Sequence, residues 1–421
     1  MPKIEKFFFI AIPFLILGIP LYYSVFPLLL AMLFLRCVTS ERTTVAAFLI
    51  LYAGPTIGCI RSIYPSLPLY GLILQLVGIL LARKEFSGFF SRSLHGFLAL
   101  LAVFGLFGVS YYVGSQNEVA QDKMFGIIQN GITAFLGYYV LCRSSKMNNE
   151  HFTHMLILTS LVMMQYLITK YSLPVGPLFD YNWFRSSSDI IRVEYEHSIV
   201  NYQHIGMNTA FAYAIFMSQK EISRNKGIYY SLICGQLVLM AGARQAVVSV
   251  IFVLIIRYLF SSSRSAVINI KQLLISGMLL IAAYYGLVAL NITAIQDFFS
   301  GGNDRDDLFI AAGVLFQNNP LTGVGMGGFY QATGEDYPHN MIYELLAECG
   351  LLIIIPMILL VIAFIYRNQI RLTQQTANRS FIFIIMLTLG IRCMVSGDFS
   401  TSIQLFSALF VLPGAVLLDK K

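Results

Sequence analysis

The residues best suited to chemistry lie in the segment Tyr337-Pro-His-Asn340. Pro338 is expected to end a loop, and Asn340 can cap the helix that follows, because an asparagine side chain accepts hydrogen bonds from the first free amides of a helix. His339 then lies at the positive end of that helix, which disfavours the imidazolium and keeps the ring neutral near pH 7. Since a neutral histidine can take a proton from a hydroxyl group, His339 is a candidate general base.

Two acidic residues follow on the same predicted helix. Glu344 and Glu348 are four residues apart, so their side chains share one helix face. At 1.5 Å per residue, Glu348 lies about 12 Å below the cap. A carboxylate at that depth in a membrane is costly unless it is paired, which makes it a functional candidate. The alternative for Glu344 is an ordinary first-turn acid that interacts with the helix dipole.

Four arginines could bind phosphate, because a guanidinium group forms bidentate hydrogen bonds with phosphate oxygens. Arg244 lies in the turn Ala-Gly-Ala-Arg-Gln, whose small residues favour close backbone approach and a buried guanidinium. The alternative for Arg244 is a side chain that extends to the lipid head groups. Arg305, Arg185 and Arg192 have acidic neighbours, so surface ion pairs are the alternative for these three.

No motif indicates a cofactor or a metal. The sequence contains no HExxH, no Walker loop and no GxGxxG, so nucleotide and metalloprotease chemistry have no recognisable site. The six cysteines lie within or at the ends of apolar segments and form no CxxC pair, which indicates packing residues. His151 and His154 are the one close pair of histidines, and we expect them in a solvated helix start rather than in a metal site.

The elements that position these residues are membrane helices. Of the 421 residues, 57% are hydrophobic and 12% are charged, about half the charge of a soluble domain, which excludes a soluble enzyme and a disordered chain. The apolar residues form blocks of roughly 16 to 25, the length that crosses a bilayer. We therefore expect an all-α polytopic bundle of about 12–14 transmembrane helices. The predicted spans are 7–19, 22–35, 43–60, 67–82, 94–113, 124–142, 152–169, 203–218, 227–241, 245–260, 272–292, 341–366, 380–396 and 401–418.

The basic residues predict the topology. With the N-terminus in the cytoplasm, most of the 28 Lys and Arg residues fall on the cytoplasmic side, as the positive-inside rule requires. Both termini are then cytoplasmic, and the formal charge of +7 reflects topology rather than nucleic-acid binding. Residues 7–35 could instead form one tilted span, which would move only the N-terminus outward. Eight basic residues are left outside: Arg61, Lys123, Lys170, Arg185, Arg192, Arg244, Arg305 and Arg392.

Two outer connections are longer than packed helices require, at 170–202 and 293–340. The second contains an apolar stretch with helical spacing at 308–316, followed by a proline and a glycine-rich turn. Together these loops could cover a cavity at the outer surface, or they could simply cap helix ends. The predicted division is helices in 1–169, a loop in 170–202, helices with the Arg244 turn in 203–292, a loop with a short helix in 293–340, and helices in 341–421.

The His339-Asn340 pair, nine residues and then Gly350 resemble the His-[Asn/Ser/Gln]-x9-Gly signature of the superfamily of bacterial O-antigen ligases and O-antigen polymerases. That signature continues with Gly, Thr or Tyr three residues later, where this chain has Ile353.

Two upstream elements agree with this resemblance in order and membrane side. Arg244-x3-Val248 is similar to an Arg-x3-Leu element of the superfamily, with Val in place of Leu. Asp304-Arg305, the helix after it and the run Pro320-Leu-Thr-Gly-Val-Gly resemble the large periplasmic loop before the histidine. The resemblance covers about residues 240–366.

The resemblance implies metal-independent, inverting glycosyl transfer at the periplasmic face of the bacterial inner membrane, without a cofactor. The donor would be a glycan on undecaprenyl pyrophosphate, with the lipid tail between the helices. Arg244 and Arg305 would bind the pyrophosphate, and His339 would deprotonate the acceptor hydroxyl. Substrate-binding residues would be Arg192, Arg185, Asn340, Glu344 and Tyr337.

The acceptor distinguishes the members of the superfamily. A polymerase joins repeat units, and the well-developed loop 170–202 favours this interpretation, with a chain-length regulator as a further partner. A ligase, which transfers the glycan to lipid A-core, is the alternative, since an Arg-x10-Gly pattern of some polymerases is absent here. A flippase for lipid-linked oligosaccharide is the alternative outside the enzymes, but no internal repeat supports it.

Overall fold

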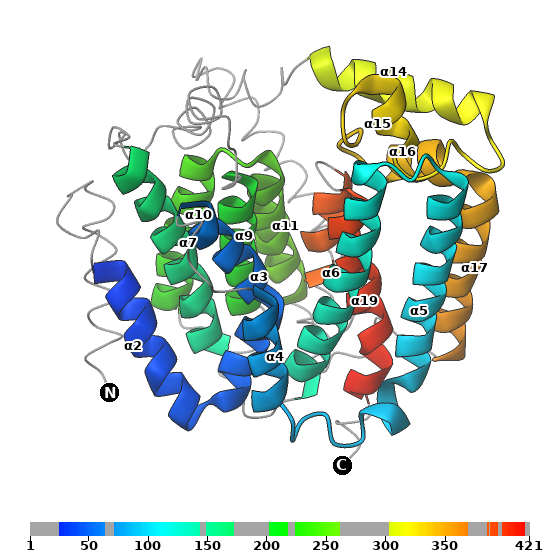
Figure 1. Cartoon of the computed structure of the whole chain (residues 1–421). Helices are drawn as coiled ribbons and strands as arrows, with labels where there is room; N and C mark the ends of the chain where they lie inside the picture. The colour runs from blue at the N-terminus through cyan, green and yellow to red at the C-terminus, as the bar shows by residue number, and fades with distance from the viewer. Residues whose placement is uncertain are drawn as a thin grey trace. The chain divides into compact units, whose positions relative to one another are not determined.

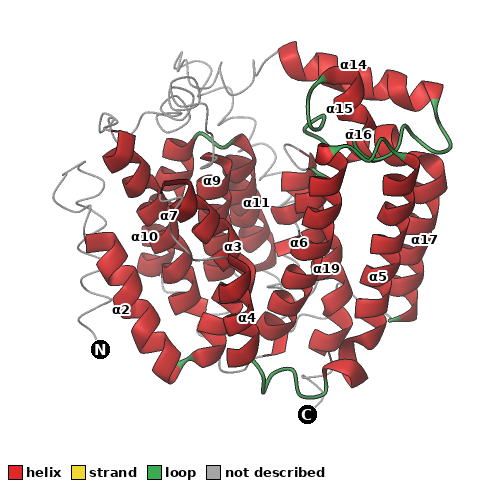
Figure 2. Ribbon diagram, viewed as in Figure 1, coloured by secondary structure: helices red, strands yellow, loops and turns green. Residues whose placement is uncertain are grey.

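The computed structural model describes residues 25–63, 71–143, 149–171, 202–217, 224–261, 303–368, 385–386, 388–394 and 398–416. These residues form helices joined by turns, and none of them lies in a strand (Figure 2). The predicted all-α class is confirmed for this part of the chain. The predicted spans 7–19 and 272–292 lie outside the described residues, as does the predicted loop 170–202 apart from its ends at 170–171 and 202, which are helical; 380–396 is described only in part.

The chain forms two compact units, each built from two segments of the sequence: residues 1–85 with 144–286, and residues 86–143 with 287–421. The helices of unit 1 are α2 (Val25–Ser40), α3 (Arg42–Ile63), α4 (Gly71–Leu81), α7 (Asn149–Tyr171), α9 (Tyr202–Met217), α10 (Arg224–Ala241) and α11 (Arg244–Ser261). Those of unit 2 are α5 (Phe89–Val113), α6 (Glu118–Arg143), α14 (Asn303–Asn318), α15 (Gly328–Thr333), α16 (Met341–Glu344), the π-helical turn η2 (Leu345–Cys349), α17 (Gly350–Arg367) and α19 (Phe399–Val416).

Unit 1 is centred on α9, which packs against α7, α10 and α11. Its interior is aromatic, with the rings of Phe216 and Tyr230 stacked at 3.8 Å between centroids. His154 contributes a ring nitrogen hydrogen-bonded to the Tyr230 hydroxyl. His151 and His154 are 4% and 3% exposed, so the expectation of a solvated helix start is wrong: both rings face the core from α7.

Unit 2 is a group of long helices with a cover at one end. α19 lies along α6 and α5, and α17 lies along α5. Small residues allow the close approach that helices make in membranes. A Cβ on Gly96 of α5 would lie 2.1 Å from the carbonyl oxygen of Phe410, and Ser407 donates a 2.9 Å hydrogen bond to the carbonyl of Gly131 on α6.

Three helical stretches of the described chain, all in unit 2, are long and apolar enough to cross a membrane. They are Ser93–Val113, Glu118–Cys142 and Met341–Arg367. The outward faces of α5 and α17 are apolar as well, with Leu98 and Ile358 both 51% exposed. Such faces suit contact with lipid chains, where a soluble protein would place polar side chains.

Candidate functional site

A cover of short helices closes one end of unit 2. We call residues 303–340 the loop cap; it contains α14, α15 and the turns between them. Figure 1 shows α14 lying across the end of the long helices, with α15 and α16 beneath it. The helix predicted at 308–316 is therefore confirmed, as part of α14. Ala312 on its inner side forms a buried cluster with Phe329 and Ala347, and the ring of Phe309 stacks on Tyr343 of α16 at 4.8 Å.

The glycine-rich turn of the loop cap packs so closely against neighbouring backbone that its glycines have no room for a side chain. Gly323, Gly325 and Gly327 have φ values of 63°, 78° and 80°. A Cβ on Gly323 would lie 2.7 Å from the carbonyl oxygen of Ala347, and one on Gly325 would lie 2.2 Å from the Cα of Gly114. The turn thus runs between η2 and the connection from α5 to α6, and these backbone contacts explain why glycine recurs in the run.

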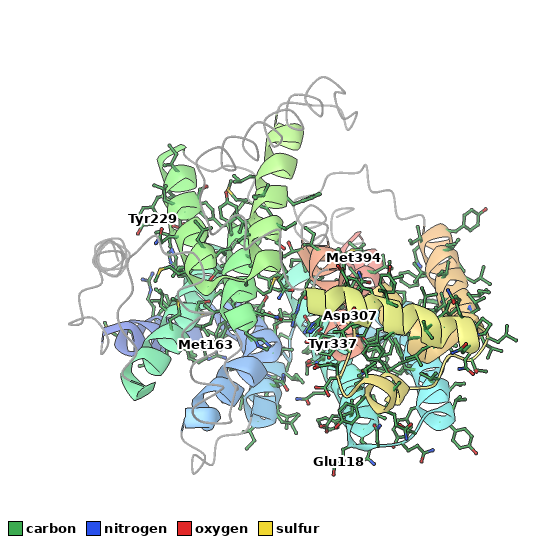
Figure 3. The ribbon with its side chains drawn as sticks, turned by 90° about the horizontal axis from the view of Figure 1, so that it is seen from above. Glu118, Met163, Tyr229, Asp307, Tyr337 and Met394 are labelled. Atoms are coloured by element: carbon green, nitrogen blue, oxygen red, sulfur yellow. The ribbon has the colours of Figure 1, made fainter. Side chains whose placement is uncertain are left out.

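The segment predicted to carry chemistry lies where the loop cap meets α16. Asn340 is the N-cap, as expected: its Oδ1 accepts hydrogen bonds from the amides of Ile342 (2.9 Å) and Tyr343 (3.4 Å). Its Nδ2 donates to the carbonyl of Met394 at 2.9 Å, which connects the cap to the helical residues 388–394. In Figure 3, Tyr337 and Met394 lie near the end of α14 that carries Asp307.

His339 has a strained backbone. Its φ is 58°, a conformation that residues other than glycine rarely adopt and that clusters at functional sites. The rings of His339 and Tyr337 meet edge to face with 4.6 Å between centroids. The turn therefore fixes the imidazole beside the phenol, at the end of the loop cap and just before the first turn of α16.

The helix after Asn340 is interrupted. α16 passes into the π-helical turn η2, and Gly350 then has φ 59°, with its Cα too close to Gly323 and Leu321 for any side chain. Beyond it, the amides of Leu351 and Leu352 donate to the carbonyls of Pro320 and Leu321 at 2.9 and 2.8 Å. The spacing from His339-Asn340 to Gly350 thus corresponds to one short helical segment, which begins at the N-cap Asn340 and ends where Gly350 interrupts the helix. π-helical turns occur often at functional sites.

The two glutamates of this segment are paired, as a deep carboxylate requires. Glu344 and Glu348 are completely buried, and Lys123 of α6 lies between them, 2.8 Å from Oε1 of Glu344 and 3.0 Å from Oε1 of Glu348. Glu344 is therefore more than a first-turn acid. Lys123 was missed as a site residue; the available signal was its place among the few basic residues on the outer side, next to a predicted span.

Other charged groups lie around Tyr337. Burial raises the pKa of the Tyr337 hydroxyl well above its usual value, and the carboxylates of Asp398 and Glu344 raise this pKa further, while Arg392 lowers it. Asp398 precedes α19 and accepts a 2.9 Å hydrogen bond from the amide of Thr401. Tyr337 thus remains a neutral hydroxyl that can donate a hydrogen bond.

The structure brings together Tyr337, His339, Asn340 and Glu344, but the side chains of the four predicted arginines are not among those it describes. Arg244 is the first residue of α11 in unit 1, and Arg305 lies in α14 of unit 2; both side chains are outside the described residues. Arg185 and Arg192 fall in 172–201, which is also outside.

One group in unit 1 has the side chains of a metal site. Cys37, Glu41 and His151 offer ligand atoms within 4.8 Å of one another. His151 Nδ1 lies 2.8 Å from Oε2 of Glu41, so a hydrogen-bonded pair accounts for the arrangement of these two side chains. The five cysteines whose side chains are described are buried, as expected of packing residues.

Comparison with known proteins adds no assignment to this geometry. The chain matches no model of a protein family, and a search of curated proteins found no similar one.

Proposed function

We propose that this chain is a glycosyltransferase of the bacterial inner membrane that joins undecaprenyl-pyrophosphate-linked repeat units into a surface polysaccharide. The observation that carries the proposal is the strained turn before the Asn340-capped helix, which holds His339 and Tyr337 together at the end of the loop cap, next to helices of membrane-crossing length. In the proposed topology both termini are cytoplasmic and the loop cap is periplasmic.

The reaction assigns a step to each group. His339 takes the proton of the acceptor hydroxyl while that oxygen attacks C1 of the donor sugar. The bond from C1 to the pyrophosphate oxygen breaks with inversion, and the electron pair leaves with the pyrophosphate. Arg244 and Arg305 stabilise that departing charge. The donor already carries its leaving group, so the transfer needs no nucleotide.

Tyr337 and Asn340 have supporting roles in this proposal. The neutral Tyr337 hydroxyl donates a hydrogen bond to a sugar oxygen, and Asn340 maintains the backbone that presents His339. Glu344 supports the acceptor side of the site from below, and Arg185 and Arg192 bind substrate from the other outer loop. A chain-length regulator is the expected protein partner.

Deleting the gene in its host tests the reaction class. Surface lipopolysaccharide and the undecaprenyl-linked pool are then separated on gels. Core bearing a single repeat unit, without a ladder, is the result expected for a polymerase. Bare core with long polymer left on the lipid carrier would instead identify a ligase. Bare core with unpolymerised units on the cytoplasmic side would identify a flippase and contradict both enzymes.

Complementation of the deletion tests His339. H339A should restore no ladder although the protein accumulates in membranes, because the proton acceptor is gone. H339N is the matched variant, since asparagine adopts left-handed backbone more readily than most residues and lacks the basic nitrogen. A normal ladder with both variants would exclude His339 as the general base.

A further inference from the structure

Lys123 is the centre of a buried group of charges beneath the candidate site. Its side chain is 5% exposed, and those of Glu344 and Glu348 are 0% exposed. Two carboxylates thus share one ammonium group, whose Nζ also lies 5.6 Å from the centroid of the Phe399 ring on α19. Removing one member of a buried pair leaves the other charge unbalanced, which is far more destabilising than losing a surface ion pair.

Through Glu348, Lys123 holds the glycine-rich turn. Oε1 of Glu348 accepts hydrogen bonds from the amides of Gly327 (3.1 Å) and Phe329 (3.3 Å) as well as from Lys123. These amides belong to the end of the turn and the start of α15. One carboxylate oxygen therefore connects α6, η2 and the loop cap.

Through Glu344, Lys123 holds the other side of the site. Glu344 is four residues after Asn340, at the end of the first turn that Asn340 caps, and its amide donates to the carbonyl of Asn340 at 3.0 Å. An ion pair from α6 to this turn fixes the segment to which His339 is attached. Both carboxylate oxygens of Glu344 and Oε2 of Glu348 have no hydrogen-bond partner among the described residues, so the ion pairs with Lys123 are the main compensation for these two carboxylates.

We infer that Lys123 is a positioning residue of the transfer site; this inference rests on the proposed function. It acts through Glu344 on the turn that carries His339 and through Glu348 on the glycine-rich turn, and so keeps the two sides of the site in one arrangement. Lys123 is buried below the loop cap and acts on the substrate only through these two carboxylates.

Two substitutions of Lys123 separate charge from shape. K123M leaves two buried carboxylates without their cation, and we expect kcat to fall at least about tenfold with a smaller change in KM, because small displacements of reacting groups cost up to about 100-fold. K123R keeps the charge and should recover a large part of kcat. The matched control is K226M, whose lysine pairs with Glu150 at an exposed position in unit 1 and should leave transfer unchanged.

A neutral triple variant tests whether the charges act by holding the structure. In K123M/E344Q/E348Q no buried charge is unbalanced, and the side-chain amide oxygen introduced by E348Q can still accept hydrogen bonds from the amides of Gly327 and Phe329. We call the hydrogen bonds from the amides of Gly327 and Phe329 to the side chain at position 348 the clamp. Hydrogen exchange of a peptide covering 324–333 reports this clamp without any activity assay. We expect fast exchange in K123M, slow exchange in K123R and the triple variant, and partial recovery of transfer in the triple variant.

Several results would overturn the inference. Slow exchange and normal transfer in K123M would show that the clamp does not need Lys123. A triple variant with slow exchange and no transfer would show that the charges take part in the chemistry itself. If K123M does not accumulate in membranes, the triple variant tests the inference in its place. A triple variant that is also absent from membranes would exclude unbalanced buried charge as the cause of the loss. Wild-type protein without transfer would contradict the proposed function, while exchange would still report the clamp.

Discussion

Asn340 combines two contacts in one side chain. Its Oδ1 accepts from the first amides of α16, and its Nδ2 donates to the carbonyl of Met394, far along the chain. The cap is a local feature that any isolated helix could have. The second contact is tertiary, and it ties the start of α16 to residues 388–394.

Two substitutions of Asn340 separate these contacts. N340A removes both, and the lost cap alone should lower the free energy of unfolding by about 1 kcal/mol. N340S keeps an oxygen that can cap the helix but cannot reach Met394, so its stability should lie between those of N340A and the wild type. Thermal unfolding in detergent micelles measures the order, and N340S at or below N340A would contradict the assignment.

Tyr337 makes the stability depend on pH in the alkaline range. Its pKa is raised in the folded protein by burial, so the folded state holds the phenolic proton more tightly than the unfolded chain does. The corresponding stability is present below the unfolded pKa of about 10 and is lost as pH rises above it. The wild type should therefore lose stability relative to Y337F as pH rises above about 10. Unfolding midpoints of both proteins between about pH 9 and pH 11 test the sign, since a gain in stability of the wild type relative to Y337F over this range would contradict it.

At the scale of elements, the break at Gly350 determines how the helix and the loop cap fit together. The positive φ and the short distances to Gly323 and Leu321 leave no room for a Cβ. The π-helical turn before it leaves carbonyls for partners outside the helix: the carbonyl of Ala347 accepts from the amide of Val324 in the loop cap at 2.8 Å, and the carbonyl of Glu348 accepts from the Ser110 hydroxyl of α5 at 3.0 Å.

G350A should destabilise unit 2 by at least about 1 kcal/mol from backbone strain alone. The matched control is G313A in α14, where a Cβ meets nothing within 4 Å. Because alanine favours a helix interior over glycine by about 0.5–1 kcal/mol, G313A should be neutral or stabilising. Thermal unfolding of the two variants in the same detergent makes the comparison, and equal effects would exclude the steric explanation.

The parts of this site that could be predicted are those with a local pattern. The Asn340 cap and the helix at 308–316 follow from neighbouring residues, and the structure confirms both. The pairing of Lys123 with Glu348, 225 residues away, leaves no local pattern. The break at Gly350 was missed too: 341–366 was predicted as one span, because hydropathy does not register backbone conformation. The burial of His151 and His154 was missed because polar residues at a helix start usually face solvent.

At the scale of the whole molecule, the proposed topology puts the two ends of unit 2 on opposite sides of the membrane. Asp307 is exposed on α14 at the end with the loop cap, and Arg367 is exposed at the far end of α17. D307C should react with a membrane-impermeant maleimide in cells whose outer membrane alone is permeabilised, and R367C only after the inner membrane is opened. The described native cysteines are buried, which keeps the background low. Labelling of both positions from one side would contradict the topology.

The interruption at Gly350 also bears on how deep the charged group around Lys123 lies in a membrane. α17 has 18 residues, which at 1.5 Å per residue is about 27 Å, close to the roughly 30 Å hydrocarbon thickness of a bilayer. In the proposed topology, α17 crosses the hydrocarbon without α16 and η2, so Lys123, Glu344 and Glu348 lie at the level of the lipid head groups. A pyrophosphate attached to a polyprenyl chain lies at that same level. In the proposed reaction the donor would thus meet the site at its natural depth, without being lifted out of the bilayer.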